Sequence, residues 1–366
     1  MKRSVLAVCI LGLVAAGGFS QNMPGTGMIK GGVAGEARNL TGAGATFPAV
    51  LYTKWFSEYV KLTGVEVNYQ PIGSGGGIKS ISDQTVDFGA TDGPMSDEQL
   101  AAAKGGKILH IPMAMGSVVP TYNIPELATS NEGLRFTADT LSGIYLGEIL
   151  KWNDAKLVED NPSLKPVDKY IVVVHRSDGS GTTNIWTSYL SSVSENWAKQ
   201  VGASNSVQWP VGLGGKGNEG VAGNVKQTPY SIGYVEEAYA VQNKLPLALV
   251  KNKSGKFILP TTKATSLAAQ GVALPDDLRV KLVNSDNPDA YPVVGFTWIL
   301  AYARQTDAPK ALALSRLLWW CTHDAQSYNA GLEYAPLPLD AVKKAEALMK
   351  AIMIKGKPAL PATIAK

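Results

Sequence analysis

The sequence contains few of the residues that form disulfides and metal sites. It has two cysteines, Cys9 and Cys321, and three histidines. Cys9 lies in an apolar N-terminal stretch, so Cys321 alone remains for the folded part, and we expect no disulfide within it. Cys321 and His323 would point to different faces of a helix, and the histidines lack metal-ligand spacing. We therefore expect neither a metal nor a cofactor.

Charge is also sparse. Charged residues make up 17% of the chain, and basic residues exceed acidic ones only by 34 to 30. No long run of like charge occurs, so the electrostatic footprint of nucleic-acid binding is missing and we expect no nucleic-acid partner. After the N-terminal stretch, no apolar segment is long enough to span a membrane. The 45% of hydrophobic residues indicates a folded globular protein, and the length of 366 residues predicts two domains or two lobes.

The N-terminus has the features of a secretory signal. Basic residues precede an apolar stretch from Val5 to Phe19, and small and polar residues follow. We assign residues 1–20 to a signal peptide, with cleavage after Ser20 or as late as Ala37. Residues 21–37 are expected to form a flexible glycine-rich segment of an exported, soluble protein.

Three segments combine glycine with hydroxyl or charged residues at apparent strand-to-helix junctions. A helix start leaves its first backbone N–H groups unpaired and carries the positive end of the helix dipole, so glycines there let an oxyanion approach closely. One such loop is weak evidence, because an ordinary flexible turn has the same composition. Three of them suggest that distant parts of the chain bind one tetrahedral oxyanion. They are Gly42-Ala43-Gly44-Ala45-Thr46-Phe47-Pro48, Ile72-Gly73-Ser74-Gly75-Gly76-Gly77 and Arg176-Ser177-Asp178-Gly179-Ser180-Gly181-Thr182.

The hydrophobic pattern alternates between strands and helices. Apolar residues recur at helical spacing from Pro48 to Tyr59, and a strand, a loop and a helix follow one another between residues 171 and 190. This order predicts an α/β protein with largely parallel sheets, whose ligand lies at the carboxyl ends of strands. The other expected elements are strands over 65–69, 86–90 and 291–302, a helix beginning at Ile78, and helices over 311–320 and 340–353.

With these motifs the chain resembles the periplasmic phosphate-binding proteins of high-affinity phosphate ABC transporters. The resemblance extends from about Leu40 to about Pro338. It is carried by the first and third loops above together with Val86-Asp87-Phe88-Gly89-Ala90-Thr91-Asp92 and Gly212-Leu213-Gly214-Gly215-Lys216-Gly217-Asn218. The family fold implies two α/β lobes of the type II periplasmic-binding-protein class, with a two-segment hinge and a ligand cleft between the lobes. Lobe 1 would comprise residues 38–117 and 292–366, and lobe 2 residues 118–291.

The resemblance also implies a set of phosphate ligands. Asp178 would support Arg176 by orienting or partly neutralising its guanidinium. Asp92 would act as the filter, because phosphate keeps a proton that it can donate to a carboxylate, whereas sulfate has none. One departure from many relatives is that glycine follows Ser74 where they carry a second serine. The residues carried over as phosphate ligands are Thr46, Phe47, Ser74, Asp92, Arg176, Ser180, Gly181 and Thr182.

Other functions remain open at this stage. A receptor for another tetrahedral oxyanion, such as arsenate or sulfate, would need the same kind of cradle. A secreted phosphatase could use Ser180 as nucleophile, although Asp178 and Thr182 occupy the positions two before and two after the serine, where a hydrolase elbow needs glycine. An ATPase is disfavoured because Ile78 replaces the glycine before the lysine of a phosphate loop. From the family we expect a periplasmic, monomeric binding protein without enzymatic activity that delivers phosphate to membrane permease subunits.

Overall fold

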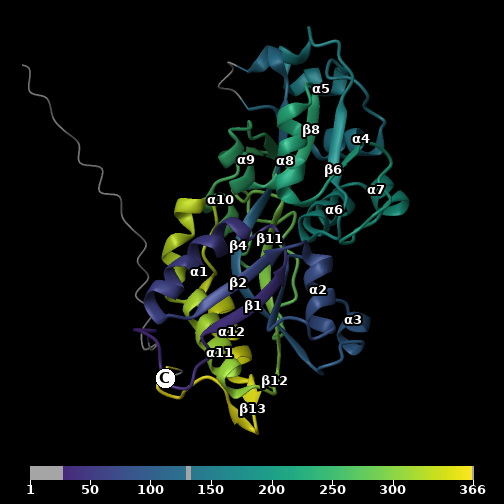
Figure 1. Ribbon diagram of the computed structural model, residues 1–366. Coiled ribbons are helices and arrows are strands. Elements are labelled where there is room, and N and C mark those ends of the chain that lie inside the picture. Colours follow the sequence, from purple (N-terminus) through teal and green to yellow (C-terminus); the bar gives the residue numbers. More distant parts are fainter. Residues whose placement is uncertain (1–27, 129–132, 365–366) are drawn as a thin grey trace, which may run out of the picture.

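The computed structural model describes residues 28–128 and 133–364. Two lobes lie one above the other in Figure 1, and the lower lobe contains both the early and the late parts of the chain. Within the described ranges, no helix has the length and apolar character needed to cross a bilayer. The predictions for residues 1–27, including the signal peptide, fall outside the described residues.

Eight strands of the described part form one sheet, in the order β2-β1-β3-β11-β4-β8-β6-β7, and two small three-stranded sheets accompany it. The strands are β1 Asn39–Gly44, β2 Glu66–Pro71, β3 Phe88–Thr91, β4 Ile108–Asn123, β5 Arg135–Phe136, β6 Val172–Arg176, β7 Leu213–Gly215, β8 Ser231–Glu236, β9 Leu249–Lys251, β10 Phe257–Ile258, β11 Val294–Tyr302, β12 Arg304–Gln305, β13 Met353–Ile354 and β14 Lys357–Pro358. The α-helices are α1 Ala49–Thr63, α2 Ser74–Ser82, α3 Asp97–Ala101, α4 Ala138–Leu146, α5 Ala155–Asp160, α6 Gly181–Val193, α7 Glu195–Gln200, α8 Gly217–Gln227, α9 Glu237–Asn243, α10 Thr262–Leu267, α11 Ala308–Thr322 and α12 Leu339–Lys350.

Strand β4 continues from one lobe into the other. Its first part, up to Ser117, pairs antiparallel with β11, and its second part, from Val118, pairs antiparallel with β8. At this changeover the N–H of Val118 donates to the carbonyl of Val293 at 2.9 Å. Figure 1 shows β4 and β11 passing through the level at which the lobes meet. Two neighbouring chain segments therefore connect the lobes.

The sheet is parallel where the predicted loops leave it. β1 pairs parallel with β2 and β3, and β6 pairs parallel with β7 and β8. The expectation of largely parallel strands is thus correct for the outer strands but wrong for β4 and β11. Those two strands run antiparallel to their partners because the chain passes twice between the lobes.

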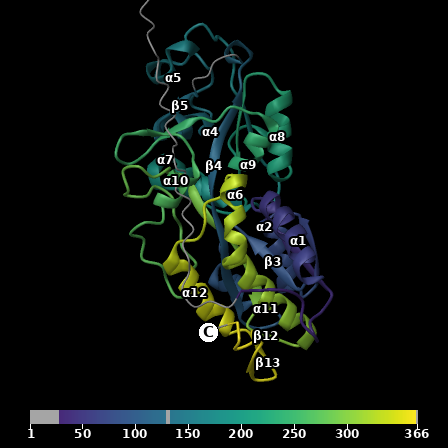
Figure 2. The ribbon, with the colours of Figure 1, turned by 90° about the vertical axis from the view of Figure 1, so that its left-hand side faces the viewer.

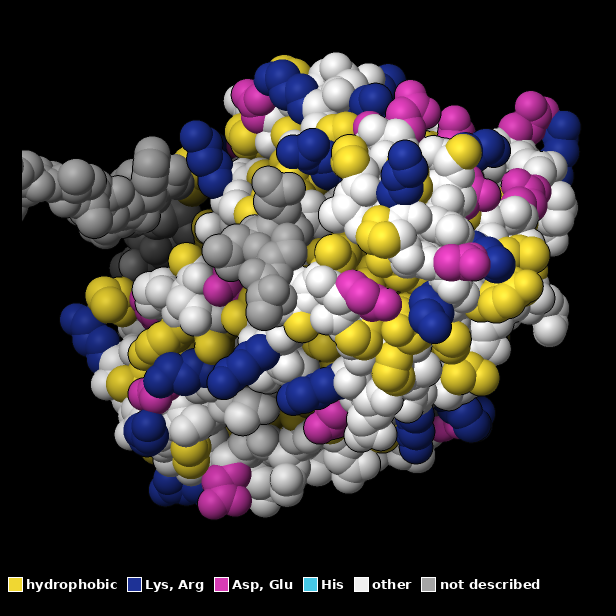
Figure 3. All heavy atoms as spheres, turned by 90° about the horizontal axis from the view of Figure 1, so that it is seen from above, with side chains coloured by type: hydrophobic (Ala, Val, Ile, Leu, Met, Phe, Trp, Pro, Cys, Tyr) yellow, Lys and Arg dark blue, Asp and Glu magenta, His cyan; other side chains and the backbone are white. Residues whose placement is uncertain are grey.

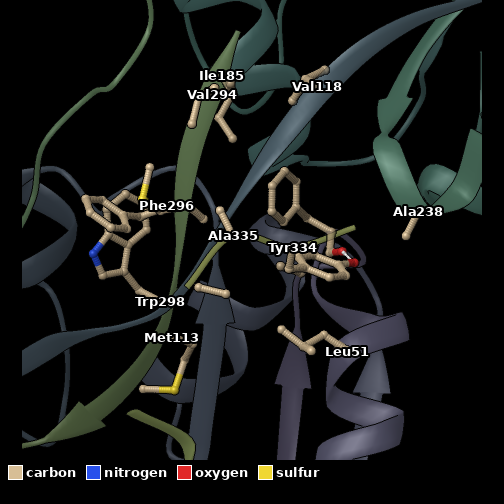
Figure 4. Packing of buried hydrophobic residues seen from close by; sticks show 14 of the residues in the cluster. Leu51, Met113, Val118, Ile185, Ala238, Val294, Phe296, Trp298, Tyr334 and Ala335 are labelled. Atoms are coloured by element: carbon tan, nitrogen blue, oxygen red, sulfur yellow. Dashed lines mark hydrogen bonds between the residues drawn. The ribbon is translucent and has the colours of Figure 1, made fainter. Parts of the chain in front are cut away.

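Helices pack on the sheet and bury an apolar core that continues through both lobes. In α1, residues Leu51, Trp55 and Tyr59 recur at helical spacing and are all fully buried, which is the pattern of a helix with one apolar face. Figures 1 and 2 show α1, α11 and α12 beside the strands of the lower lobe. In the close view of Figure 4, Leu51 lies lower and Val118 higher within the same continuous core cluster.

The predicted elements are present, but several helices begin earlier than expected, among them the two that follow the second and third predicted loops. Helix α2 begins at Ser74 rather than Ile78, so the three glycines after Ser74 form its first turns instead of a loop. Helix α6 begins at Gly181 rather than at Thr183 after the third loop, and the Ser180 hydroxyl accepts a hydrogen bond from the N–H of Thr183 at 3.0 Å as N-cap. Because glycine is a poor helix former, the sequence did not indicate that either helix starts this early.

Residues 28–37 lie against α11, in contrast to the flexibility that we expected of them. Arg316 of α11 donates from Nε to Glu36 Oε2 at 2.8 Å, and the side chains of this pair are only 4% and 3% exposed. Arg316 also donates to the carbonyl of Gly31. Ile29 is buried in the main core cluster. A buried ion pair and an apolar contact therefore hold this segment to the lobe.

Glu36→Ala is expected to lower the free energy of unfolding by about 3 kcal/mol, because it leaves the buried guanidinium of Arg316 without its counter-charge. Urea unfolding of the purified protein measures this. Glu195→Ala is the matched control, since Glu195 pairs with Lys199 in solvent with 82% and 70% of the side chains exposed and should change stability by less than about 0.5 kcal/mol. Equal losses in the two variants would contradict the structural role of residues 28–37.

Candidate functional site

The three loops predicted to bind an anion converge between the lobes. Helices α1, α2 and α6 begin in these loops, and α8 begins beside them. The positive ends of four helix dipoles are thereby directed at one small region. The eight residues predicted as phosphate ligands all lie there and are all buried.

Ser74 is held at the start of α2 by contacts with both lobes. Its Oγ accepts hydrogen bonds from the backbone N–H of Asp92 at 3.2 Å and from that of Gly181 at 3.0 Å. The preceding Gly73 has φ of 90°, and a Cβ at this position would lie 2.3 Å from Asp178 Oδ2. Only glycine satisfies both the backbone conformation and the close approach.

Asp92 follows β3 and is 2% exposed. Its Oδ1 accepts a hydrogen bond from Thr297 Oγ1 of β11 at 2.9 Å, and its Oδ2 lies 3.3 Å from Ser74 Oγ. Burial raises the pKa of Asp92 to about 7, although Thr297, Arg176 and Ser74 favour the charged form. Near neutral pH this carboxyl can therefore accept a hydrogen bond when charged or donate one when protonated.

Arg176 at the end of β6 forms a bidentate pair with Asp178. Its Nε donates to Oδ1 at 2.7 Å and its Nη2 to Oδ2 at 2.5 Å, while its side chain is 1% exposed. Burial opposes the ionisation of Asp178, but Arg176 and the N–H of Gly217 outweigh it and lower the pKa of Asp178. Asp178 thus lies against the guanidinium of Arg176, and Nη1 of Arg176 donates to Thr182 Oγ1 at 3.4 Å.

Thr46 and Thr182 meet across the lobes through Asn218 of α8. Asn218 Nδ2 donates to Thr46 Oγ1 at 2.9 Å and to Thr182 Oγ1 at 3.0 Å. Beside them, Tyr239 donates from its hydroxyl to the carbonyl of Thr46 at 2.7 Å. Phe47 is fully buried, and its carbonyl accepts a hydrogen bond from Tyr334 at 2.6 Å.

The lobes are closed on one another at this site. The N–H of Gly75 donates to the carbonyl of Gly179 at 2.9 Å, which joins the second loop to the third. At Gly181, an added Cβ would lie 2.6 Å from three atoms, namely Asp92 N, Asp92 Oδ2 and Ser74 Oγ. A surface groove of about 440 Å³ between α1 and β2 is lined by none of the site residues. The candidate site is thus enclosed between the lobes, away from that groove.

The arrangement does not favour the phosphatase alternative. Ser180 Oγ caps α6, and no hydrogen bond joins it to any of the three histidines. His110 accepts from the N–H of Met95, and His175 stacks on the ring of Trp209 at 4.8 Å between centroids. None of the three is in position to activate the serine. Within the described residues, no group of His, Cys, Asp and Glu could hold a metal ion.

Known proteins share much of this sequence and its fold. A model of the PBP superfamily domain matches residues 31–316. The chain is 42% identical over 317 residues to the phosphate-binding protein PstS of Pasteurella multocida, and the match covers 86% of this chain and 91% of that protein. The chain belongs to the PstS family. The family predicted from the sequence motifs is confirmed.

Solved structures support the same fold for this PstS family member. A high affinity periplasmic phosphate-binding protein, solved with phosphate bound, superposes with a TM-score of 0.68 at 19% identity, covering 84% of this chain and 93% of that one. An ABC-type phosphate transport receptor from Vibrio cholerae gives a TM-score of 0.52 at 18% identity, covering 82% of this chain and 100% of that one. The predicted two-lobed periplasmic-binding-protein fold is confirmed.

Sequence reasoning missed several residues of the site. Asn218 follows a glycine at the start of α8, and this pattern of glycine and a polar residue at a helix start also marks the other loops. Thr297 lies inside a fully buried strand, and nothing in the local pattern marks it. Glu236, Tyr239 and Tyr334 join the site only through tertiary contacts.

Gly181→Ala is expected to abolish tight phosphate binding, because the new methyl group would push Ser74 and Asp92 away from the start of α6. Calorimetric titration with phosphate measures this effect, and urea unfolding confirms that the variant is folded. Gly223→Ala in α8 is the matched control, since nothing lies within 4 Å of a Cβ there. If both variants bind like the unmodified protein, the close approach at Gly181 has no role in binding.

Proposed function

We propose that this chain captures inorganic phosphate between its two lobes and delivers it to the permease of an ABC transporter. The observation that carries this proposal is the enclosed cluster of hydroxyl groups, helix starts and Arg176 around the buried carboxyl of Asp92. The phosphate-binding names of its PstS relatives support the same ligand.

The cluster suits phosphate because it offers many donors and little net charge. We propose Thr46, Ser74, Ser180 and Thr182 as hydroxyl donors, with backbone N–H groups near Phe47 and Gly181. The charge of Arg176 is largely balanced by Asp178, so the anion is stabilised mainly by dipoles. Asp92 then takes the proton that phosphate retains.

We propose that the lobes comprise residues 38–117 with 292–366 and residues 118–291, and that they rotate about the two connecting segments. The exchange of strand partners along β4 between Ser117 and Val118 supports the first boundary. The bond from Val118 to Val293 supports a second boundary close by. Groups from both lobes can contact one anion together only in the closed form. The anion therefore binds the closed form more tightly than the open form.

The remaining features of this proposal come from the family. The protein acts in the periplasm as a monomer and meets the membrane permease subunits of its transporter; we assign it no enzymatic activity. On the face seen in Figure 3, Lys and Arg side chains are interspersed with Asp and Glu. Because the sequence contains no long run of like charge, we propose no nucleic-acid partner. Arsenate is the second candidate ligand, because it also carries a proton that Asp92 could accept.

Isothermal titration of the phosphate-stripped mature protein is the direct test. We expect one phosphate per chain, with an affinity that excess sulfate leaves unchanged. No binding, or equal competition by sulfate, would overturn phosphate as the ligand. Repeating the titration with arsenate ranks the two protonated oxyanions.

Selectivity should depend on pH through Asp92. With a pKa of about 7, Asp92 carries a proton below pH 7 and can donate to sulfate, whereas above pH 7 its carboxylate accepts and rejects sulfate. The ratio of the sulfate to the phosphate dissociation constant should therefore rise as pH increases through about 7. Competition titrations across roughly pH 5.5 to 8.5 measure this ratio.

The control for that experiment is Asp92→Asn, which can donate at every pH. Its selectivity at alkaline pH should be at least about 10²-fold lower than that of the unmodified protein and should not change with pH. Asp92→Ala should also lower selectivity, because no acceptor remains. A pH-dependent ratio that persists in Asp92→Asn would assign the effect to the ligand instead.

A further inference from the structure

Asn218 forms hydrogen bonds to residues of both lobes. It is the second residue of α8 and is fully buried. Besides the bonds from Nδ2 to the two threonines, its backbone N–H donates to Thr46 Oγ1 at 3.2 Å. Its Oδ1 accepts from the backbone N–H of Glu236 at 2.9 Å. Every hydrogen-bonding direction of the side-chain amide is used by these contacts except one lone pair.

The orientation of this amide follows from its partners. A backbone N–H can only donate, so the atom that faces Glu236 must be the amide oxygen, and the NH₂ group must face the threonines. Both amide hydrogens are consequently given to hydroxyl oxygens. The end of β8 thereby determines how the side chain of Asn218 presents its donors to the site.

The two hydroxyl groups are left as donors. A hydroxyl has two lone pairs and one hydrogen. Thr46 Oγ1 receives two hydrogen bonds from Asn218, and Thr182 Oγ1 receives one from Asn218 and a long one from Arg176. With their lone pairs occupied, these hydroxyls retain only the capacity to donate.

We propose that Asn218 is a positioning residue that fixes the Thr46 and Thr182 hydroxyls as donors toward a bound oxyanion and ties this polarity to closure of the lobes. The proposal rests on the proposed function, since it concerns the same site. Asn218 need not touch the anion itself. It maintains a ring of donors, so that Asp92 is left as the acceptor for the proton of the anion.

The test compares phosphate titrations of the unmodified protein, Asn218→Asp and Asn218→Ala. The Asn218→Asp substitution replaces the NH₂ group by a carboxylate oxygen, which accepts from the threonines and turns their hydrogens away from the anion. It should therefore weaken binding at least about 10²-fold. Asn218→Ala leaves the hydroxyls free to rotate and should weaken binding by about tenfold. The new carboxylate would also repel the anion, so the order of the two variants is interpreted together with the coupling to Thr182→Val, which does not depend on an added charge.

Two controls separate orientation from other effects. Asn224→Asp places the same new charge on α8 outside the cluster, where Asn224 donates to the carbonyl of Gly214 at 3.4 Å, and should leave affinity within about twofold. In a Thr182→Val background, Asn218→Ala should cost less than it does alone, because one of its partners is already gone. Urea unfolding of each variant excludes loss of the fold.

The outcomes are distinct. Failure of the unmodified protein to bind phosphate overturns the proposed function. Binding by the unmodified protein with equal affinities for both Asn218 variants, or with full additivity in the Thr182→Val background, overturns the role of Asn218 alone.

Discussion

Enclosure of a polar cluster between two lobes is the constraint on which the site depends. A buried hydroxyl, amide or charge without a partner costs on the order of 1–3 kcal/mol, so a closed cleft is stable only if its groups satisfy one another or a ligand. In this protein the cross-lobe bonds of Ser74 with Gly181 and of Thr46 with Asn218 meet that requirement. The glycines at these points let backbone and side chain come within hydrogen-bond distance.

The electrostatics of the cleft follow from the same enclosure. A full counter-charge for the ligand would be costly to bury while the lobes are closed, and the Arg176–Asp178 pair avoids this by keeping the net local charge small. The neighbouring carboxyls respond to burial in another way. Burial raises the pKa of Glu236 well above its ordinary value and that of Glu237 to about 8, and Asp92 behaves in the same way. Burial therefore opposes negative charge on these acids, and Asp178 balances the charge of Arg176.

The sequence predicted the α/β class, the elements that carry the loops and the region in which they converge, because those features depend on local periodicity and on glycine at helix starts. It could not locate α2, whose first turns are Ser74-Gly75-Gly76-Gly77, since intrinsic propensity argues against a helix there. Nor could it find Thr297, which reaches Asp92 from a strand 205 residues away. The packing of α11 against residues 28–37 was hidden for the same reason, as a buried ion pair has no local signature.

The way in which the two lobes are connected affects how strongly closure can favour a bound ligand. β4 pairs with β11 up to Ser117 and with β8 from Val118, so the proposed rotation about these residues would move whole strands and the helix starts attached to them. A ligand can shift such an equilibrium only by the difference between its affinities for the open and closed forms. The cross-lobe contacts of Ser74 and Asn218 exist only in the closed form, so under our proposal the donors of both lobes face the anion together only after closure. Closure of the lobes and recognition of the anion therefore depend on the same hydrogen bonds. A substitution that misdirects one donor weakens both.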